Sequence, residues 1–243
     1  ARAADAIVLS LPSPAAVDDV MGELVPAGRA GLLVIDTSTV DADTNRRAHA
    51  ACRAAGIGYL DAPISGGEAM GGGVDGARAA SVTFMVGGEP EDVERARPVL
   101  ALLGRHVFHL GPSGAGTEVK LISNMCSGAY AVIAAEAFAA GAALGIAPER
   151  LVEVFSHTDA KSFFMTDYLV PRLLAGRYDD GFDVRLQLKD HRLFGALAER
   201  LGVPAPANAL ATATYEEAMA LDAERDVTAI VERAIDAARA RRA

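Results

Sequence analysis

Lys120 and Asn124 are the two residues in this sequence whose types and spacing best suit catalysis. They follow the glycine-rich stretch 111–116 and lie near the start of a long segment with the composition of a helix. Residues four apart share one face of an α-helix, with their Cβ atoms roughly 5–6 Å apart. The positive end of the helix dipole and burial both disfavour the charged form of an amine. The pair therefore predicts a general acid/base lysine beside an orienting amide, and the open alternative is a surface lysine above a buried asparagine.

The glycines at 111, 114 and 116 do not form a phosphate-binding motif by themselves. The spacing from Gly111 to Gly116 resembles a phosphate loop, but Thr117 occupies the position where that motif needs lysine. As a dinucleotide fingerprint the glycine order is inverted, and no acidic residue ends a strand some twenty residues later. We therefore expect this turn to position Lys120.

Composition excludes several other kinds of site. The chain has 243 residues, 51% of them hydrophobic, and a formal net charge of −9, which argues against nucleic acid as a partner. Cys52 and Cys126 lack the spacing of a zinc site or a disulfide framework. The five histidines are scattered, so we expect no metal. We also expect no membrane partner, because no apolar run reaches about eighteen residues and no signal peptide is present.

Apolar runs alternate with helical patterns up to residue 110. Strands are predicted at 6–11, 31–35, 59–63, 82–86 and 107–110, with helices at 17–24, 42–55 and 90–103. This alternation predicts a doubly wound parallel sheet of the Rossmann type. The Gly- and Ala-rich stretch 68–80 lacks periodicity, and it is predicted to be a loop.

Everything after residue 116 has the pattern of helices. The first is predicted at 117–144, and others at 148–157, 162–174, 185–201, 206–221 and 227–242. The first of these is too long to cover one face of a compact sheet domain. The sequence therefore predicts an α/β domain at residues 1–116 and an all-helical domain at residues 117–243.

Polar residues follow three of the predicted strands. In α/β sheets ligands bind at the carboxyl ends of the strands, which here are Leu11-Pro12, Ser38-Thr39 and Ser65-Gly66-Gly67. The last of these can present a hydroxyl and successive backbone N–H groups to a carboxylate or phosphate. A tight turn is an equally good interpretation of that stretch alone.

Together these motifs resemble the β-hydroxyacid dehydrogenases. The resemblance rests on the segment 61–67, on the stretch 111–124 that carries Lys120 and Asn124, and on the run from Phe182 to Lys189-Asp190. That family includes 3-hydroxyisobutyrate dehydrogenase and tartronate semialdehyde reductase, and it is related to 6-phosphogluconate dehydrogenase. The motifs occur in the family's order along nearly the whole chain.

The resemblance implies oxidation of a small 3-hydroxy acid, or reduction of the matching semialdehyde, with NAD or NADP as cofactor. It assigns proton transfer to Lys120 and positioning of the substrate to Asn124. The substrate carboxylate is then expected at Ser65, Gly66 and Gly67. The expected cofactor contacts are Leu11, Pro12, Ser38, Thr39, Gly116, Lys189 and Asp190. A cytoplasmic homodimer or larger homo-oligomer is also implied.

The sequence departs from the family at its beginning. The family starts with a strand and a G-x-G-x-x-G turn, and nothing of this kind precedes Ala6, so the Rossmann domain is expected to be incomplete at its N-terminus. The first residue is Ala1 and not methionine, so further residues upstream are an open alternative. Two other functions stay open: a non-catalytic binding or oligomerisation module, against which the presence of Lys120, Asn124 and Lys189 argues, and an imine-reductase-like enzyme, a group that usually replaces this lysine.

Overall fold

The structure is a computed structural model that describes residues 3–66, 73–179 and 181–241. The chain divides into two compact units, Ala1–Ile122 and Ser123–Ala243. This division lies six residues beyond the predicted boundary at 116/117, because the first turns of the long helix pack with the first unit. Each unit is described separately below.

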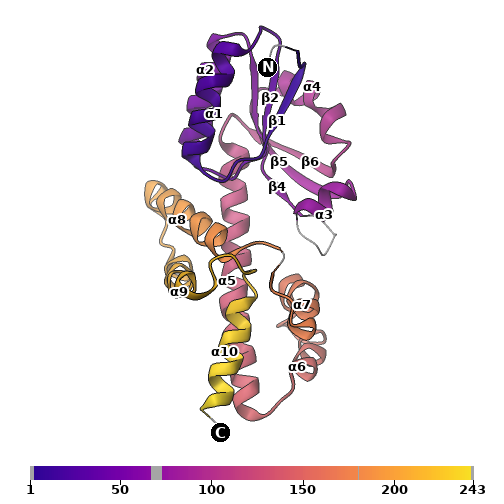
Figure 1. Cartoon of the computed structure of the whole chain (residues 1–243), viewed down its shortest axis with the longest axis vertical. Helices are drawn as coiled ribbons and strands as arrows, with labels where there is room; N and C mark the ends of the chain where they lie inside the picture. Colours follow the sequence, from indigo (N-terminus) through magenta and orange to yellow (C-terminus); the bar gives the residue numbers. More distant parts are fainter. Residues whose placement is uncertain (1–2, 67–72, 180, 242–243) are drawn as a thin grey trace. The chain divides into compact units, whose positions relative to one another are not determined.

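The first unit alternates strands and helices, as predicted (Figure 1). Its strands are β1 (Ala6–Leu9), β2 (Leu33–Asp36), β3 (Gly58–Asp61), β4 (Ile64–Ser65), β5 (Val82–Gly87) and β6 (Gly104–Gly111). Its helices are α1 (Pro14–Ala27), α2 (Ala42–Ala54), α3 (Gly73–Arg78) and α4 (Pro90–Leu100). The helix α5 (Ala115–Leu144) starts in this unit and continues into the second.

The sheet is mixed. β1, β2 and β3 are parallel, whereas β3 and β4 both run antiparallel to β5. β6 pairs with β5 in parallel, so β3 and β4 lie in line along the other edge of β5. The carboxyl ends of β3, β5 and β6 consequently meet near Asp61, Gly87 and Gly111.

Helices cover both faces of the sheet (Figure 1). Val17 and Met21 of α1 and Cys52 of α2 pack with Val34 and Tyr59 on one face. On the opposite face Val93, Ala96 and Leu100 of α4 pack with alternate residues of β2, β3 and β5. Burial of both faces explains why β2, β3 and β5 read as continuous apolar runs. The flanking helices confirm the predicted doubly wound α/β fold, but β5 and β6 run antiparallel to β1, β2 and β3, whereas a parallel sheet was predicted.

Two elements were missed. The two-residue strand β4 is too short to show alternation, and it forms only because Ile64 and Ser65 continue the line of β3 along β5. Helix α3 lies in the stretch predicted to be a loop, where glycine and alanine hide any apolar period. Residues 67–72 of that predicted loop lie outside the described residues.

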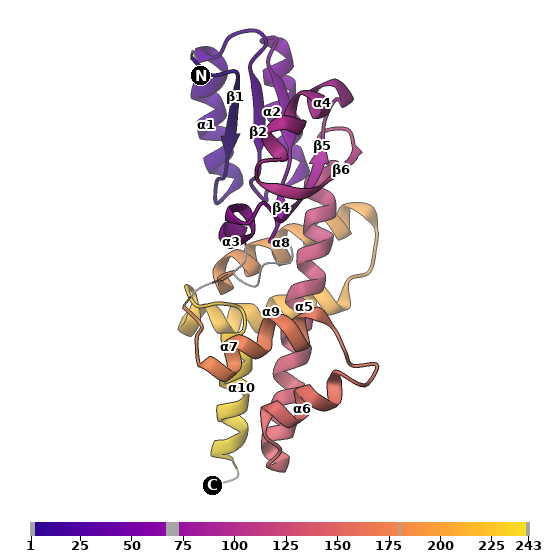
Figure 2. The same ribbon diagram turned by 90° about the vertical axis from the view of Figure 1, so that its right-hand side faces the viewer.

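The second unit is built from helices around the later part of α5 (Figure 2). They are α6 (Pro148–Phe155), the π-helical turn η1 (Phe164–Tyr168), α7 (Leu169–Ala175), α8 (Val184–Leu201), α9 (Pro206–Asp222) and α10 (Ala229–Ala240). One core joins α5 to these helices through Phe138, Leu169, Leu188, Tyr215 and Ile235. Among the described residues after Gly111 no strand is present, as predicted, and one isolated bridge joins Asp183 to Asp226.

Helix α5 corrects one prediction. Contrary to the expectation that no apolar run reaches membrane length, its 30 residues have the length and hydropathy of a membrane span. In its most apolar window 44% of the residues are buried within the structure. Ala131, Ala134 and Phe138 of α5 are at most 1% exposed. We therefore interpret α5, which is about 45 Å long, as the core helix of the second unit.

Gly116 allows the start of α5 to lie directly on the sheet. A Cβ at this position would lie 2.2 Å from the carbonyl oxygen of Met85 and 2.9 Å from that of Asp61. No side chain fits there without movement of the backbone. Glycine at position 116 therefore fixes the distance between α5 and β5.

We predict that Gly116→Ala lowers the free energy of unfolding by about 1–3 kcal/mol, because the added methyl forces the helix off the strand. Gly22→Ala is the matched control, since Gly22 lies in α1 and a Cβ there meets nothing within 4 Å. That control is expected to gain about 0.5–1 kcal/mol from helix propensity. Urea denaturation of both variants is the measurement, and an unchanged midpoint for Gly116→Ala would contradict the packing argument.

Candidate active site

The start of α5 is held by a carboxylate from the sheet. Asp61, the last residue of β3, is fully buried and accepts hydrogen bonds from the backbone N–H groups of Gly114 (2.7 Å) and Thr117 (3.0 Å). These groups belong to the unpaired donors that every helix N-terminus carries. Asp61 thus caps a helix that begins more than fifty residues later in the chain.

Helix α2 supports the same turn. The side-chain amide of Asn45 donates to the hydroxyl of Thr117 at 3.1 Å, and the hydroxyl of Ser113 donates to the carbonyl of Asn45 at 3.3 Å. Burial raises the pKa of Asp61, while the hydrogen bonds from Gly114 and Thr117 act in the opposite direction. The position of the α5 start is therefore specified by polar contacts as well as by the close packing of Gly116.

Lys120 lies in the second turn of α5, because the helix begins at Ala115 and not at the predicted 117. The side chain is buried, with 8% of the residue exposed. The interpretation of Lys120 as a surface lysine therefore does not fit. A buried position beside a helix N-terminus is the environment that the sequence analysis expected for an acid/base lysine.

Ser65 and the start of α5 both lie along β5. Ser65 pairs with Thr83, and Gly116 packs on the carbonyl of Met85, two residues further along the same strand. Two residues of a strand span about 7 Å, and Lys120 follows Gly116 by one helix turn. Ser65 and Gly66 are half-buried, and Gly67 lies outside the described residues. The predicted carboxylate-binding turn and the first turn of the helix that carries the predicted acid/base residue thus lie beside nearby residues of β5.

The loops after β1 and β2 are tied together at the same edge of the sheet. The backbone N–H of Leu11 donates to the hydroxyl of Ser38 at 2.8 Å, and Ser38 is buried. Asp36, at the end of β2, accepts from the N–H of Ser38 and from the hydroxyl of Tyr59, both at 2.9 Å. Burial raises the pKa of Asp36, and these hydrogen bonds partly offset that effect. Ser38 therefore joins the two loops.

This edge suits a dinucleotide. Pro12 is exposed, and Leu11 and Thr39 are half-buried, so neutral groups face outward. The two acids that end β2 and β3 are sealed by their own hydrogen bonds and are at most 1% exposed. No described carboxylate at these strand ends is therefore open to repel a pyrophosphate.

In the second unit, Asn124 and the two predicted residues of α8 lie together. Asn124 is buried, and its side-chain N–H donates to a carboxylate oxygen of Asp190 at 2.5 Å. The ammonium of Lys189 lies 3.1 Å from the other oxygen of Asp190. Asp190 is itself fully buried, whereas the Lys189 side chain is 22% exposed. The structure thus brings Asn124 of one predicted motif together with Lys189 and Asp190 of another.

Two contributors were missed in the sequence. Asp61 is the first residue of the motif 61–67. Its role could have been predicted from the position of a carboxylate at the end of a fully buried strand. Gln187 donates to the backbone carbonyl of Asn124 at 2.9 Å. The sequence indicates the role of Gln187 less clearly, because the only feature is a polar residue three positions before Asp190 on the same helix face.

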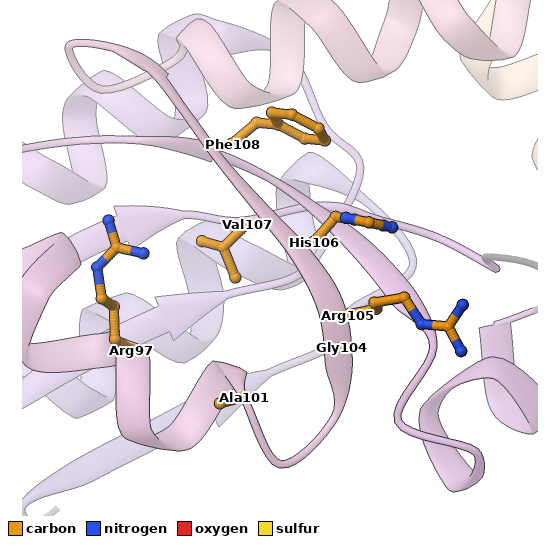
Figure 3. A pocket seen from close by; sticks show the side chains of 7 residues that line it. All are labelled: Arg97, Ala101, Gly104, Arg105, His106, Val107 and Phe108. Carbon is orange, nitrogen blue, oxygen red and sulfur yellow. The ribbon is translucent and has the colours of Figure 1, made fainter.

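A pocket of about 410 Å³ lies elsewhere, between α4 and the outer edge of β6 (Figure 3). It is lined by Arg97, Ala101, Gly104, Arg105, His106, Val107 and Phe108. None of the predicted site residues is among them. We interpret this pocket as a surface crevice beside an edge strand.

Comparison with known proteins identifies the family of the chain. Residues 1–111 match the NAD-binding domain of 6-phosphogluconate dehydrogenase, and residues 114–234 match the NAD-binding domain of NADP-dependent 3-hydroxyisobutyrate dehydrogenase. The chain is 32% identical to 2-(hydroxymethyl)glutarate dehydrogenase of Eubacterium barkeri, over 95% of this chain and 76% of that protein. It is also 32% identical to the NAD-dependent L-serine dehydrogenase of Pseudomonas aeruginosa, over 94% and 78%.

Among solved structures, Mycobacterium tuberculosis 3-hydroxyisobutyrate dehydrogenase with L-serine superposes with a TM-score of 0.84 at 30% identity, covering 95% of this chain and 79% of that one. An imine reductase from Bacillus cereus shares the fold at 15% identity and a TM-score of 0.56. That likeness shows the fold alone, so it does not favour the imine-reductase alternative.

The chain belongs to the β-hydroxyacid dehydrogenase family. It is an oxidoreductase that uses NAD or NADP. The predicted family, enzyme class and cofactor are confirmed.

We predict that Asp61→Ala lowers the free energy of unfolding by about 1–3 kcal/mol, because two buried N–H groups lose their acceptor. Asp61→Asn keeps a hydrogen-bond acceptor, so it is expected to lower the free energy of unfolding by less. It also removes the dependence of stability on pH that comes from the Asp61 carboxyl. Since burial raises the pKa of Asp61 above 3.8, the folded chain binds more protons than the unfolded chain between 3.8 and the raised value. In that window the stability of the wild type falls as pH rises.

Urea denaturation from about pH 4 to 7 measures this contribution. Asp43→Asn, which removes an exposed carboxylate on α2, is the control. If the stability of Asp61→Asn varied with pH as the wild type does, Asp61 would not be the titrating group.

Proposed function

We propose that this enzyme interconverts a small 3-hydroxy acid and the corresponding semialdehyde, with Lys120 as the general acid/base. The observation that carries the proposal is the buried Lys120, set in the second turn of a helix whose start is fixed by Asp61. When bound, NAD(P) is the hydride acceptor or donor. The neutral amine of Lys120 takes the proton of the substrate hydroxyl as the carbonyl forms, and the ammonium returns that proton in the reverse direction.

The substrate class is supported by the relatives. 2-(Hydroxymethyl)glutarate, L-serine and 3-hydroxyisobutyrate, after which these relatives are named, share a primary alcohol on the carbon next to the one that bears a carboxylate. We propose that the Ser65 hydroxyl and the N–H of Gly66, with Gly67, bind this carboxylate. A hydroxyl and successive backbone N–H groups are suitable donors for it.

Asn124 follows Lys120 by one turn of the same helix, and we propose that it orients the substrate hydroxyl. Leu11, Pro12 and Thr39 are proposed to line the nicotinamide end of the cofactor site. Ser38 and Gly116 are proposed to shape that site, Ser38 through its hydrogen bond to Leu11 and Gly116 by keeping α5 close to β5. A cofactor contact of Lys189 from the second unit also stays a proposal.

We further propose a cytoplasmic homodimer or larger homo-oligomer. One face of α5 carries Ile122, Tyr130, Ile133 and Leu144, which are 46%, 43%, 55% and 73% exposed. At about 100° per residue these four positions fall within one side of the helix. Such a stripe of large apolar side chains suits burial against a second copy. Cys52 and Cys126 are free thiols, which suits a reducing compartment.

We predict that Lys120→Ala lowers kcat by about 10²-fold or more, because a positioned proton-transfer group typically contributes that much. Ser65→Ala is the matched comparison. It is expected to raise KM for the carboxylate substrate more than for a neutral ester analogue, with a smaller effect on kcat, since it removes binding and not proton transfer. Steady-state kinetics of both variants, with dinucleotide affinity measured by calorimetry, is the test. A kcat for Lys120→Ala within threefold of wild type would reject the assignment.

A further inference from the structure

The polar cluster behind Asn124 is built by one face of α8. Gln187, Asp190 and His191 lie at positions i, i+3 and i+4, and each is at most 1% exposed. Three polar residues on the buried side of a helix are costly unless each has partners. Two of them meet α5 at Asn124.

Asp190 selects the orientation of the Asn124 amide. An ionised carboxylate only accepts hydrogen bonds, so it binds the NH2 end of an amide and excludes the carbonyl end. The side-chain nitrogen of Asn124 lies 2.5 Å from Asp190, within hydrogen-bond distance. The side-chain carbonyl oxygen of Asn124 is thereby turned away from Asp190, and in that orientation it can accept a hydrogen bond from another group.

The backbone beneath Asn124 is held as well. The side-chain amide of Gln187 donates to the backbone carbonyl of Asn124 at 2.9 Å. The hydroxyl of Tyr215 donates to the backbone carbonyl of Gly128, one helix turn later, at 3.1 Å. A Cβ at Gly128 would lie 2.1 Å from the Nε2 atom of His191 and 2.4 Å from the side-chain nitrogen of Gln187. Glycine at this position is what lets α8 come close enough to α5 for these contacts.

From these contacts we infer that Asp190 is a positioning residue for Asn124 and not a cofactor contact. One oxygen of its carboxylate faces Asn124 and the other lies 3.1 Å from the ammonium of Lys189. Being fully buried, this carboxylate has no surface to offer a dinucleotide. The inference rests on the proposed role of Asn124, and it replaces the expectation that Asp190 binds the cofactor.

The test is Asp190→Asn, with Glu199→Gln on the exposed face of α8 as the control. The expected result is a fall in kcat of about 10- to 100-fold, the scale of a misplaced positioning group, with dinucleotide affinity within twofold of wild type. A loss of dinucleotide affinity at unchanged kcat would overturn the inference, because it is the signature of a cofactor contact.

A second readout does not need turnover. In ¹H–¹⁵N spectra the side-chain amide of Asn124, assigned by its loss in Asn124→Ser, is expected to show one downfield, slowly exchanging proton. That signal should move toward ordinary positions in Asp190→Asn and stay in Glu199→Gln. An Asn124 signal that does not move in Asp190→Asn would refute the contact between these two side chains. This readout does not depend on whether Lys120 is the general acid/base.

If Asp190→Asn does not fold, the exchange variant Asn124→Asp/Asp190→Asn serves instead. It keeps the contact with donor and acceptor reversed, while Asn124→Asp alone sets two carboxylates against each other. The exchange variant is expected to unfold at higher denaturant than Asn124→Asp and to bind dinucleotide as wild type does. Equal midpoints, or lost dinucleotide binding, would overturn the inference.

Discussion

The contact between the Asp61 carboxylate and the first turn of α5 is the interaction on which the proposed site depends. It joins the end of β3 to a helix start that arrives from β6, and it satisfies two backbone donors that would otherwise be buried without partners. Gly116 makes this contact possible by letting the helix lie on the β5 backbone. Lys120 follows within one turn, so the sheet sets the position of its backbone.

Helix α5 carries Lys120 in the first unit and Asn124 in the second, and each is held by a buried carboxylate of its own unit. Asp61 acts on the helix backbone, whereas Asp190 acts on the Asn124 side chain. Both carboxylates are sealed from solvent and accept N–H groups. In this account the buried acids of the site are positioning groups, and the proton is moved by the lysine.

Much of the first unit could be predicted, because parallel strands buried on both faces are apolar throughout and the turns between them carry glycine or proline. Lys120 and Asn124 stood out as a cation and an amide at defined helix positions, whereas Lys189 was chosen through the family resemblance. The roles of Asp61 and Asp190 could not be predicted in the same way. Asp61 bonds to residues more than fifty positions away, and Asp190 to a residue 66 positions away, and no local pattern encodes such pairs. Helix α3 and strand β4 were missed because six residues rich in glycine and alanine, and two residues of strand, are too few to show a hydrophobic period.

Hydrogen exchange at the Thr117 amide is the most direct test of whether the Asp61 carboxylate holds the start of α5. In the wild type this N–H is bound to Asp61 within the first turn of α5. First-turn amides without a cap exchange easily, because they have no partner within the helix. We predict that Asp61→Ala speeds exchange of the Thr117 and Gly114 amides by about tenfold or more, on the scale of one lost hydrogen bond, while exchange of Leu121 in the next turn changes little. Exchange of Thr117 at the wild-type rate in Asp61→Ala would show that the sheet carboxylate does not hold the start of α5, and the proposed placement of Lys120 would lose its basis.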